Sequence, residues 1–228
     1  MEKTVDSLDV REYSPRDRHQ SIFETFNGLK PGEAFVLIND HEPKPLLYQF
    51  QMEHDGAYDW WVLESGPEAW RVQIARRMND DPKRTITEYF ETDHRRLDAV
   101  FNRFQSALKN GGWEEASTSI HEFNLGLRRH IKAEEEILFP MFEEKTGMTE
   151  AGPTFVMKTE HKDIKETLDK LLAATESKDA KAALSGATYL LNVLANHNMK
   201  EEHILYPESD ALASDIERPM VVKKAQAI

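Results

Sequence analysis

The sequence predicts a two-domain chain: an N-terminal α+β two-layer sandwich in residues 1–78, an all-α, up-down four-helix bundle in 82–212, and a tail at 213–228. Two observations support this prediction. Strand-like apolar runs are confined to the first part of the chain, and four long segments with helical periodicity follow it. In addition, the pattern H-x-x-x-E-E-x-I-L-(F or Y)-P occurs at 130–140 and again at 197–207, which indicates a duplicated helical unit.

Short segments in the N-terminal part predict the order β-α-β-α-β-β. They are a strand at 7–11, a helix at 15–29, a strand at 34–38, a helix at 45–52, and strands at 57–63 and 70–74. Pro15 suits the first turn of a helix, and the apolar residues after it recur at helical spacing. The run at 34–38 is continuously apolar, as is typical of a buried strand. Helices that pack on one sheet would give the two layers.

Asn79–Pro82 breaks this pattern and is predicted to be the linker. The helices beyond it are predicted at about 84–108, 114–144, 154–176 and 180–206. Pro140 is expected to bend or interrupt the second of these helices, and Pro207 to end the fourth. Short connections between the helices favour antiparallel neighbours. We assign no structure to the tail from Ser214.

Composition excludes several classes of function. The net charge of −12 argues against a role in binding nucleic acid. The sequence has no apolar run of the ~20 residues that a membrane span needs, and its start lacks the apolar segment of a signal peptide, so we expect a cytoplasmic protein. The absence of cysteine excludes thiol chemistry and cysteine-ligated metals. Any metal ion must therefore be held by His, Asp and Glu.

The duplicated pattern supplies such ligands. Residues four apart lie on one face of a helix, so each copy projects an imidazole and a carboxylate in the same direction. A second element, Thr92-Asp-His94 against Thr159-Glu-His161, repeats with the same offset, since 161 − 94 and 197 − 130 both equal 67. In an up-down bundle six side chains can converge at one level: His94, His130, Glu134, His161, His197 and Glu201.

This set of nitrogen and oxygen donors suits two iron ions, or manganese, more than zinc, and a carboxylate can bridge two cations. Taken singly, each histidine would also fit an exposed or hydrogen-bonded position on an amphipathic helix. Six candidate ligands, four histidines and two glutamates, in matched register favour the metal site, because uncompensated polar groups inside a bundle cost several kcal/mol. Two other motifs do not fit, since ferritin-like proteins use Glu-x-x-His and zinc proteases use H-E-x-x-H.

Other polar residues are given lesser roles. His121 and His203 lie off the ligand face of their helices and are expected to be exposed. Asp93 and Glu160, beside two of the candidate ligands, are expected to accept hydrogen bonds that orient imidazoles, and Asp98 is a weaker candidate of the same kind.

At these residues the chain resembles a hemerythrin-like (HHE cation-binding) domain over roughly Pro82–Leu212. The resemblance implies a non-haem di-iron centre with His94 and His130 on one iron and His161 and His197 on the other. Glu134 and Glu201 would bridge the two, together with an oxo or hydroxo ligand. Oxygen-carrying hemerythrins have a further histidine where this chain has Lys165. In this respect the chain is similar to bacterial iron–sulfur-cluster repair and nitric-oxide-responsive di-iron proteins.

The N-terminal part resembles a domain of unknown function that is often fused to hemerythrin-like domains. The similarity lies in Leu8–Arg11, Arg18-His19, Asn39–His41 and Gly66–Arg71. Its order of elements is also similar to TusA-like sulfur carriers, but Ser14-Pro-Arg16 stands where those have a cysteine, so sulfur transfer by a thiol is excluded. His19 and His41 could form a small second metal or ligand site, or be structural.

Together these features predict a di-iron protein that binds or processes dioxygen, nitric oxide or peroxide, in the oxidative or nitrosative stress response. The N-terminal domain is a possible site for a protein partner. One alternative is an oxygen or redox sensor that signals through that domain, and another is an iron donor in iron–sulfur-cluster repair. The sequence leaves open which small molecule is used, whether the protein is an enzyme, and its oligomeric state.

Overall fold

The computed structural model describes residues 3–79 and 83–228. It divides into two compact units, Met1–Arg84 and Thr85–Gln226, with the last residues Ala227 and Ile228 assigned to the first and second unit respectively. Most of the predicted linker, including Pro82 at the predicted start of the bundle, lies outside the described residues. The predicted domain limits of 1–78 and 82–212 therefore stay a prediction.

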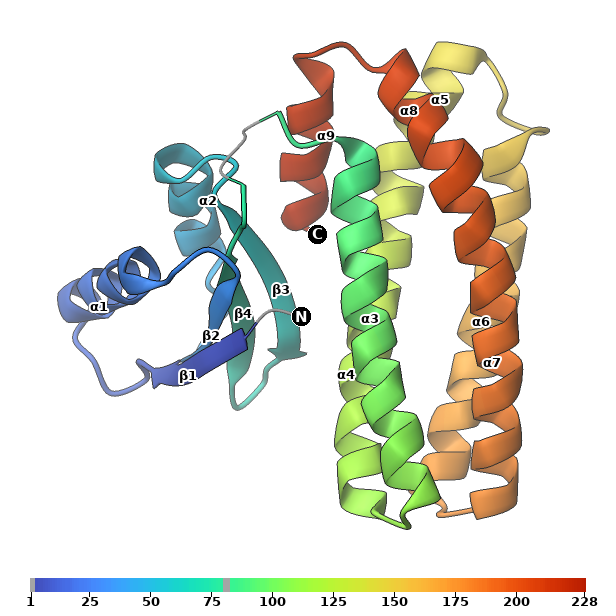
Figure 1. The fold of residues 1–228 in the computed structure, drawn as a ribbon, viewed down its shortest axis with the longest axis horizontal. Coiled ribbons are helices and arrows are strands. Elements are labelled where there is room, and N and C mark those ends of the chain that lie inside the picture. Colours follow the sequence, from blue (N-terminus) through green and yellow to red (C-terminus); the bar gives the residue numbers. More distant parts are fainter. Residues whose placement is uncertain (1–2, 80–82) are drawn as a thin grey trace. The chain divides into compact units, whose positions relative to one another are not determined.

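The first unit is a four-stranded sheet with two helices (Figure 1). Its elements are β1 (Lys3–Asp9), α1 (Pro15–Gly28), β2 (Glu33–Asn39), α2 (Lys44–Glu53), β3 (Tyr58–Ser65) and β4 (Trp70–Arg76). The strand order is β1-β2-β4-β3, in which β1 and β2 are parallel and the other pairs antiparallel. This arrangement confirms the predicted order of elements.

Both helices cover the same face of the sheet, which gives the predicted two layers. Phe50 of α2 packs against Phe26 of α1, with ring centroids 5.0 Å apart, and against Trp60 of β3 at 5.9 Å. The Arg76 guanidinium of β4 lies 5.9 Å from the centre of the Phe26 ring. Trp60 and Ile74 are paired across β3 and β4, so the aromatic cluster lies on the Ile74 side of the sheet.

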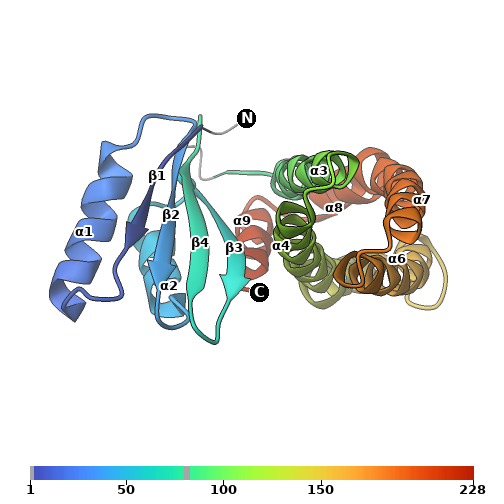
Figure 2. The same cartoon turned by 90° about the horizontal axis from the view of Figure 1, so that it is seen from below.

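The second unit is the predicted bundle, seen nearly end-on in Figure 2. Four long helices form it: α3 (Ile86–Lys109), α4 (Trp113–Ala133), α6 (Pro153–Glu176) and α7 (Ala180–Lys200). The second and fourth continue through π-helical turns, η1 (Glu134–Leu138) and η2 (Glu201–Leu205), into α5 (Phe139–Thr146) and α8 (Tyr206–Leu212). The two-domain fold class predicted from the sequence is confirmed.

Two expectations about the end of the chain are corrected. Pro207 does not end the fourth helix, because the chain continues from η2 directly into α8 and Pro207 lies in the first turn of α8. The tail that was left without structure contains α9 (Glu217–Gln226), which contacts α3, α4 and η1. Val221, Val222 and Ala225 of α9 are buried. Among the described residues no helix is long and apolar enough to cross a membrane.

An apolar core fills the half of the bundle where α3 ends and α4 begins. Its buried residues come from all four long helices, from Leu97 on α3 to Leu194 on α7. Phe101, Phe104 and Phe123 lie at its centre and are almost completely buried. This half supplies hydrophobic stabilisation to the bundle, and it leaves the other half free for polar side chains.

The first helix of the bundle is capped by a residue from the other end of the chain. Asp210 of α8 accepts hydrogen bonds from the backbone N–H groups of Ile86 and Thr87, at 2.8 and 3.0 Å, and from the Thr87 hydroxyl at 2.6 Å. The carboxylate satisfies two of the unpaired N–H groups at the start of α3 and interacts favourably with its helix dipole.

We expect Asp210→Ala to lower the free energy of unfolding of the metal-free bundle by about 1–2 kcal/mol, because the lost carboxylate caps α3 and joins it to α8. Chemical denaturation followed by far-ultraviolet circular dichroism measures this change. Asp163→Ala, at an exposed position on α6, is the matched control. Equal stability of the two variants would contradict the capping role.

Candidate metal centre

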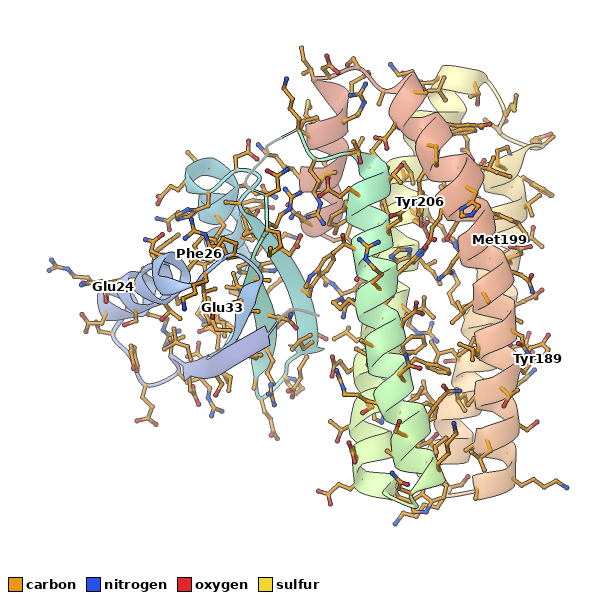
Figure 3. The ribbon with its side chains drawn as sticks, viewed as in Figure 1. Glu24, Phe26, Glu33, Tyr189, Met199 and Tyr206 are labelled. Atoms are coloured by element: carbon orange, nitrogen blue, oxygen red, sulfur yellow. The ribbon has the colours of Figure 1, made fainter. Side chains whose placement is uncertain are left out.

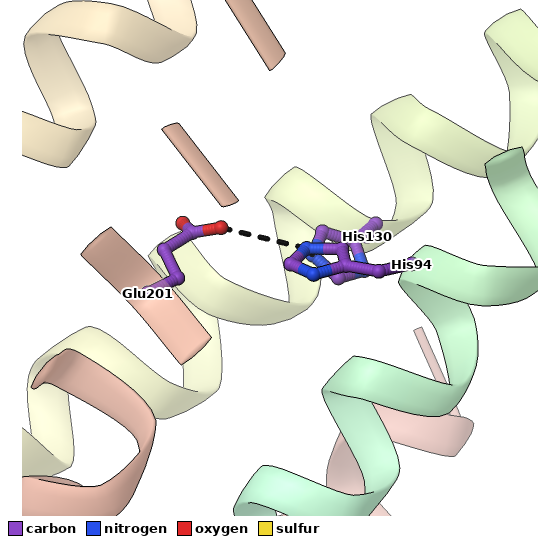
Figure 4. A group of neighbouring side chains, drawn as sticks. All are labelled: His94, His130 and Glu201. Atoms are coloured by element: carbon purple, nitrogen blue, oxygen red, sulfur yellow. Dashed lines mark hydrogen bonds and ion pairs between the residues drawn. The ribbon is translucent and has the colours of Figure 1, made fainter. Parts of the chain in front are cut away.

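Four imidazoles, one from each long helix, meet inside the bundle in two pairs. The Nε2 atoms of His94 and His130 lie 3.0 Å apart, and those of His161 and His197 lie 3.1 Å apart. None of the four is more than 4% exposed. The sequence-predicted histidines are therefore all brought together. Figure 4 shows the first pair, whose rings overlap in this view, with the Glu201 carboxylate facing them.

The two predicted glutamates lie between the imidazole pairs. Glu201 is 3.4 Å from His94 Nε2 through one oxygen and 3.0 Å from His197 Nε2 through the other. Glu134 Oε2 lies 3.3 Å from His161 Nε2 and 3.7 Å from His130 Nε2. Both carboxylates are fully buried. Each one therefore reaches an imidazole of both pairs, which is the placement that a bridging ligand needs.

The arrangement of the donor atoms fits metal ligands better than a hydrogen-bond network, because two of the buried oxygens lack a well-formed hydrogen bond within the described part of the chain. Glu134 Oε2 and Glu201 Oε1 are buried and accept no well-formed hydrogen bond from the described residues. His94, His130 and Glu201 form one group whose ligand atoms lie within 4.8 Å of one another, and His161, His197 and Glu201 form a second. Buried oxygens without such bonds are costly unless a cation compensates them, so these residues fit a pair of metal ions.

A carboxylate holds the outward-facing nitrogen of each imidazole. Each Nδ1 donates to its partner at 2.7–2.9 Å: His94 to Glu202, His130 to Asp93, His161 to Glu135, and His197 to Glu160. This bond fixes the tautomer and the ring orientation, so the Nε2 lone pair points toward the centre.

Further cations hold three of these outer carboxylates. Arg96 contacts Asp93 at 2.7 Å, Lys200 pairs with Glu160, and Lys165 donates to Glu135 at 3.3 Å. Lys165, at the position where oxygen carriers have an additional histidine, thus supports the carboxylate behind His161.

Sequence reasoning found only two of the four carboxylates that hold the Nδ1 atoms. Asp93 and Glu160 hold imidazoles as expected, although on the neighbouring helices rather than on their own. Glu135 and Glu202 were missed, even though they are the second glutamate of each E-E pair and their positions differ by the repeat length, 202 − 135 = 67. Asp98 is exposed, and no hydrogen bond joins it to a described residue.

The remaining histidines do not join the site. His121 and His203 are exposed, as predicted. In the N-terminal unit His19 is exposed, and the side chain of His41 is 63% exposed and pairs with Asp40. Neither belongs to the two candidate metal groups among the described residues.

The central charges are tightly coupled. Burial by itself would lower the pKa of His94, but the carboxylates of Glu201 and Glu202 outweigh it and raise that pKa to about 10. Burial would also lower the pKa of His161, but the carboxylates of Glu134 and Glu135 outweigh it and raise that pKa to about 11. Without a metal ion these imidazoles carry protons at neutral pH, so a cation that binds here must displace protons.

A helical bundle that gathers imidazoles and carboxylates at one level defines a class of protein that holds metal ions between its helices. Residues 85–209 match the hemerythrin HHE cation-binding domain family, and the chain belongs to that family. Residues 7–76 match a second family, described as an uncharacterized conserved protein (DUF2249). The predicted resemblance of both parts is confirmed.

The chain is also similar to curated proteins named iron-sulfur cluster repair protein YtfE. The protein from Enterobacter sp. (strain 638) is 34% identical over 100 residues, which cover 40% of this chain and 44% of the relative. Those from Salmonella paratyphi B and Salmonella newport are each 30% identical over the same lengths. The chain thus spans less than half the length of the curated relatives it matches. No solved structure matches it.

We expect Glu202→Gln to weaken binding of Fe²⁺ to the metal-free protein by about 10–100-fold, because an amide is a poorer acceptor for the His94 Nδ1–H and reduces the basicity of Nε2. Anaerobic titration measures the affinity. Glu208→Gln, at an exposed position on the following helix, is the control and should bind Fe²⁺ as the unmodified chain does. Unchanged affinity in Glu202→Gln would show that this carboxylate does not support a ligand.

Proposed function

We propose that this chain is a non-haem di-iron protein. In this proposal His94 and His130 hold one iron, His161 and His197 hold the other, and Glu134 and Glu201 bridge them. The observation that carries the proposal is the position of each buried carboxylate between the two imidazole pairs, with oxygens 3.0–3.7 Å from ring nitrogens of both. A centre with one metal ion would not require either glutamate to face both pairs.

The donor set supports iron, with manganese as the second choice. Imidazole suits iron and zinc, whereas carboxylates suit harder ions, and structural zinc is usually four-coordinate. Two imidazoles and two bridging carboxylate oxygens would give each ion four protein ligands, a number that zinc also accepts, so the ligand count does not separate the metals. The choice of iron rests on the nitrogen and oxygen donors without a thiolate. The relatives whose names refer to iron–sulfur clusters add support for iron.

We further propose that the centre binds or processes a small molecule, namely dioxygen, nitric oxide or peroxide, in the response to oxidative or nitrosative stress. Iron would supply redox chemistry and open coordination positions. The chain itself excludes water by burial, holds each Nε2 lone pair inward through an outer carboxylate, and leaves Lys165 outside the ligand set. The N-terminal unit would provide a surface for a protein partner.

Iron donation is the second candidate, because the relatives are named for iron–sulfur cluster repair. Against it, the six donor residues are at most 4% exposed, and four outer carboxylates hold the imidazoles. Such support favours a centre that retains its metal. Incubating the iron-loaded protein with an apo-acceptor separates the two roles, since a donor would lose iron to the acceptor whereas a retained centre would consume nitric oxide or peroxide and keep its iron.

We expect the unmodified chain to bind two iron ions, and His197→Ala to bind about one or fewer, because this change removes an imidazole ligand and leaves Glu201 without its nearest partner. Metal analysis after anaerobic loading and desalting measures both. His203→Ala removes an exposed imidazole six residues away and should keep two. Full iron retention in His197→Ala would refute the ligand assignment.

A further inference from the structure

Tyr206 lies within the centre and was not among the predicted site residues. It is the first residue of α8 and is fully buried. Figure 3 shows it between the helices of the bundle, whereas Tyr189 and Met199 lie on the outer surface of α7. Its ring stacks on Phe90 with centroids 5.2 Å apart, which fixes the direction of its hydroxyl group.

The Tyr206 oxygen is in contact with four of the proposed donor atoms. It lies 2.7 Å from Glu134 Oε1 and 3.2 Å from Glu201 Oε2. It also lies 3.3 Å from the Nε2 atoms of both His94 and His130. Positioning one carboxylate would not require the tyrosine oxygen to lie at the same distance from both imidazoles of one pair.

These distances are those found between neighbouring ligands of one metal ion. With metal–ligand bonds of about 2.1 Å, two ligands at right angles in an octahedral shell lie about 3 Å apart. The two imidazole nitrogens are 3.0 Å apart, the phenol oxygen is 3.3 Å from each, and Glu201 Oε2 is 3.4 Å from His94 Nε2. The phenol oxygen therefore occupies the place of a further ligand in the His94 and His130 half.

The other half of the duplicated site lacks this oxygen. The position equivalent to Tyr206 is Phe139, since 206 − 139 = 67. Its ring is stacked on His161, with centroids 5.7 Å apart and an angle of 9° between the planes. A phenyl ring fills space but offers no donor atom, so packing alone does not account for a tyrosine in one copy. The two halves differ by one oxygen donor.

We propose that Tyr206 is a direct ligand of the metal ion held by His94 and His130. The inference rests on the proposed di-iron function and makes the centre asymmetric. As the bond between the phenol oxygen and the metal ion forms, the O–H bond breaks and its proton passes to solvent, with no change in oxidation state. Tyrosine is an established ligand of iron in proteins. The small molecule would then bind at the ion held by His161 and His197, where Phe139 leaves a coordination position open.

The test is the visible and resonance Raman spectrum of the 228-residue chain loaded with iron(III). A phenolate bound to iron(III) gives a charge-transfer band in the visible region, and excitation in that band enhances tyrosinate ring vibrations. We expect both signals in the unmodified protein, and their loss in Tyr206→Phe while two iron ions per chain remain bound. Tyr89→Phe, which changes a buried tyrosine on α3, should keep both signals.

The outcomes separate this inference from the di-iron proposal. Two bound iron ions with no tyrosinate vibrations in the unmodified protein would overturn the ligand role of Tyr206 and leave the di-iron centre intact. Signals that persist in Tyr206→Phe would assign them to another tyrosine and also overturn it. An unmodified chain that binds no iron would refute the di-iron proposal itself. If Tyr206→Phe loses iron, signals that remain in Tyr89→Phe assign the ligand to Tyr206, the other buried tyrosine of the described bundle. Their absence from the iron-loaded unmodified protein overturns the assignment in every case.

Discussion

The burial of two carboxylates between four imidazoles is the constraint on which the bundle depends. Glu134 and Glu201 are 0% exposed, and a buried charge costs several kcal/mol unless it is compensated. The compensation comes in layers, first from the imidazoles and then from the carboxylates on their Nδ1 atoms. The apolar half of the bundle contributes stability that the polar half cannot, and a cation at the centre would remove most of the remaining cost.

The two π-helical turns place those carboxylates. Glu134 and Glu201 are the first residues of η1 and η2, and each turn is followed directly by an aromatic residue and a proline. A π-turn adds a residue to one turn of helix and often occurs at functional sites. It changes the rotational phase of everything after it. The residue five positions after each glutamate, Phe139 or Tyr206, is thereby aimed back at the centre, where it contacts His161 or both His94 and His130.

The sequence was sufficient to predict the features that follow from periodicity and duplication. It was insufficient for the features that depend on which helices pack against each other. The order of elements and the six donor residues follow from spacing along single helices. The pairing of Asp93 with His130, and of Glu202 with His94, crosses between helices, so it depends on how they pack. Tyr206 was given no role in the site, because a π-turn cannot be recognised from apolar periodicity. α9 was missed because its apolar residues are few and close together.

The central claim is that both halves of the duplicated unit build one centre, with two metal ions bridged by shared carboxylates. Electron paramagnetic resonance of the protein loaded with two iron(III) ions per chain tests it most directly. Bridging ligands couple the spins of two ferric ions antiparallel, so the account predicts no signal at low temperature although the iron is present by metal analysis. Signals of isolated high-spin iron(III) that account for all the bound iron would contradict it.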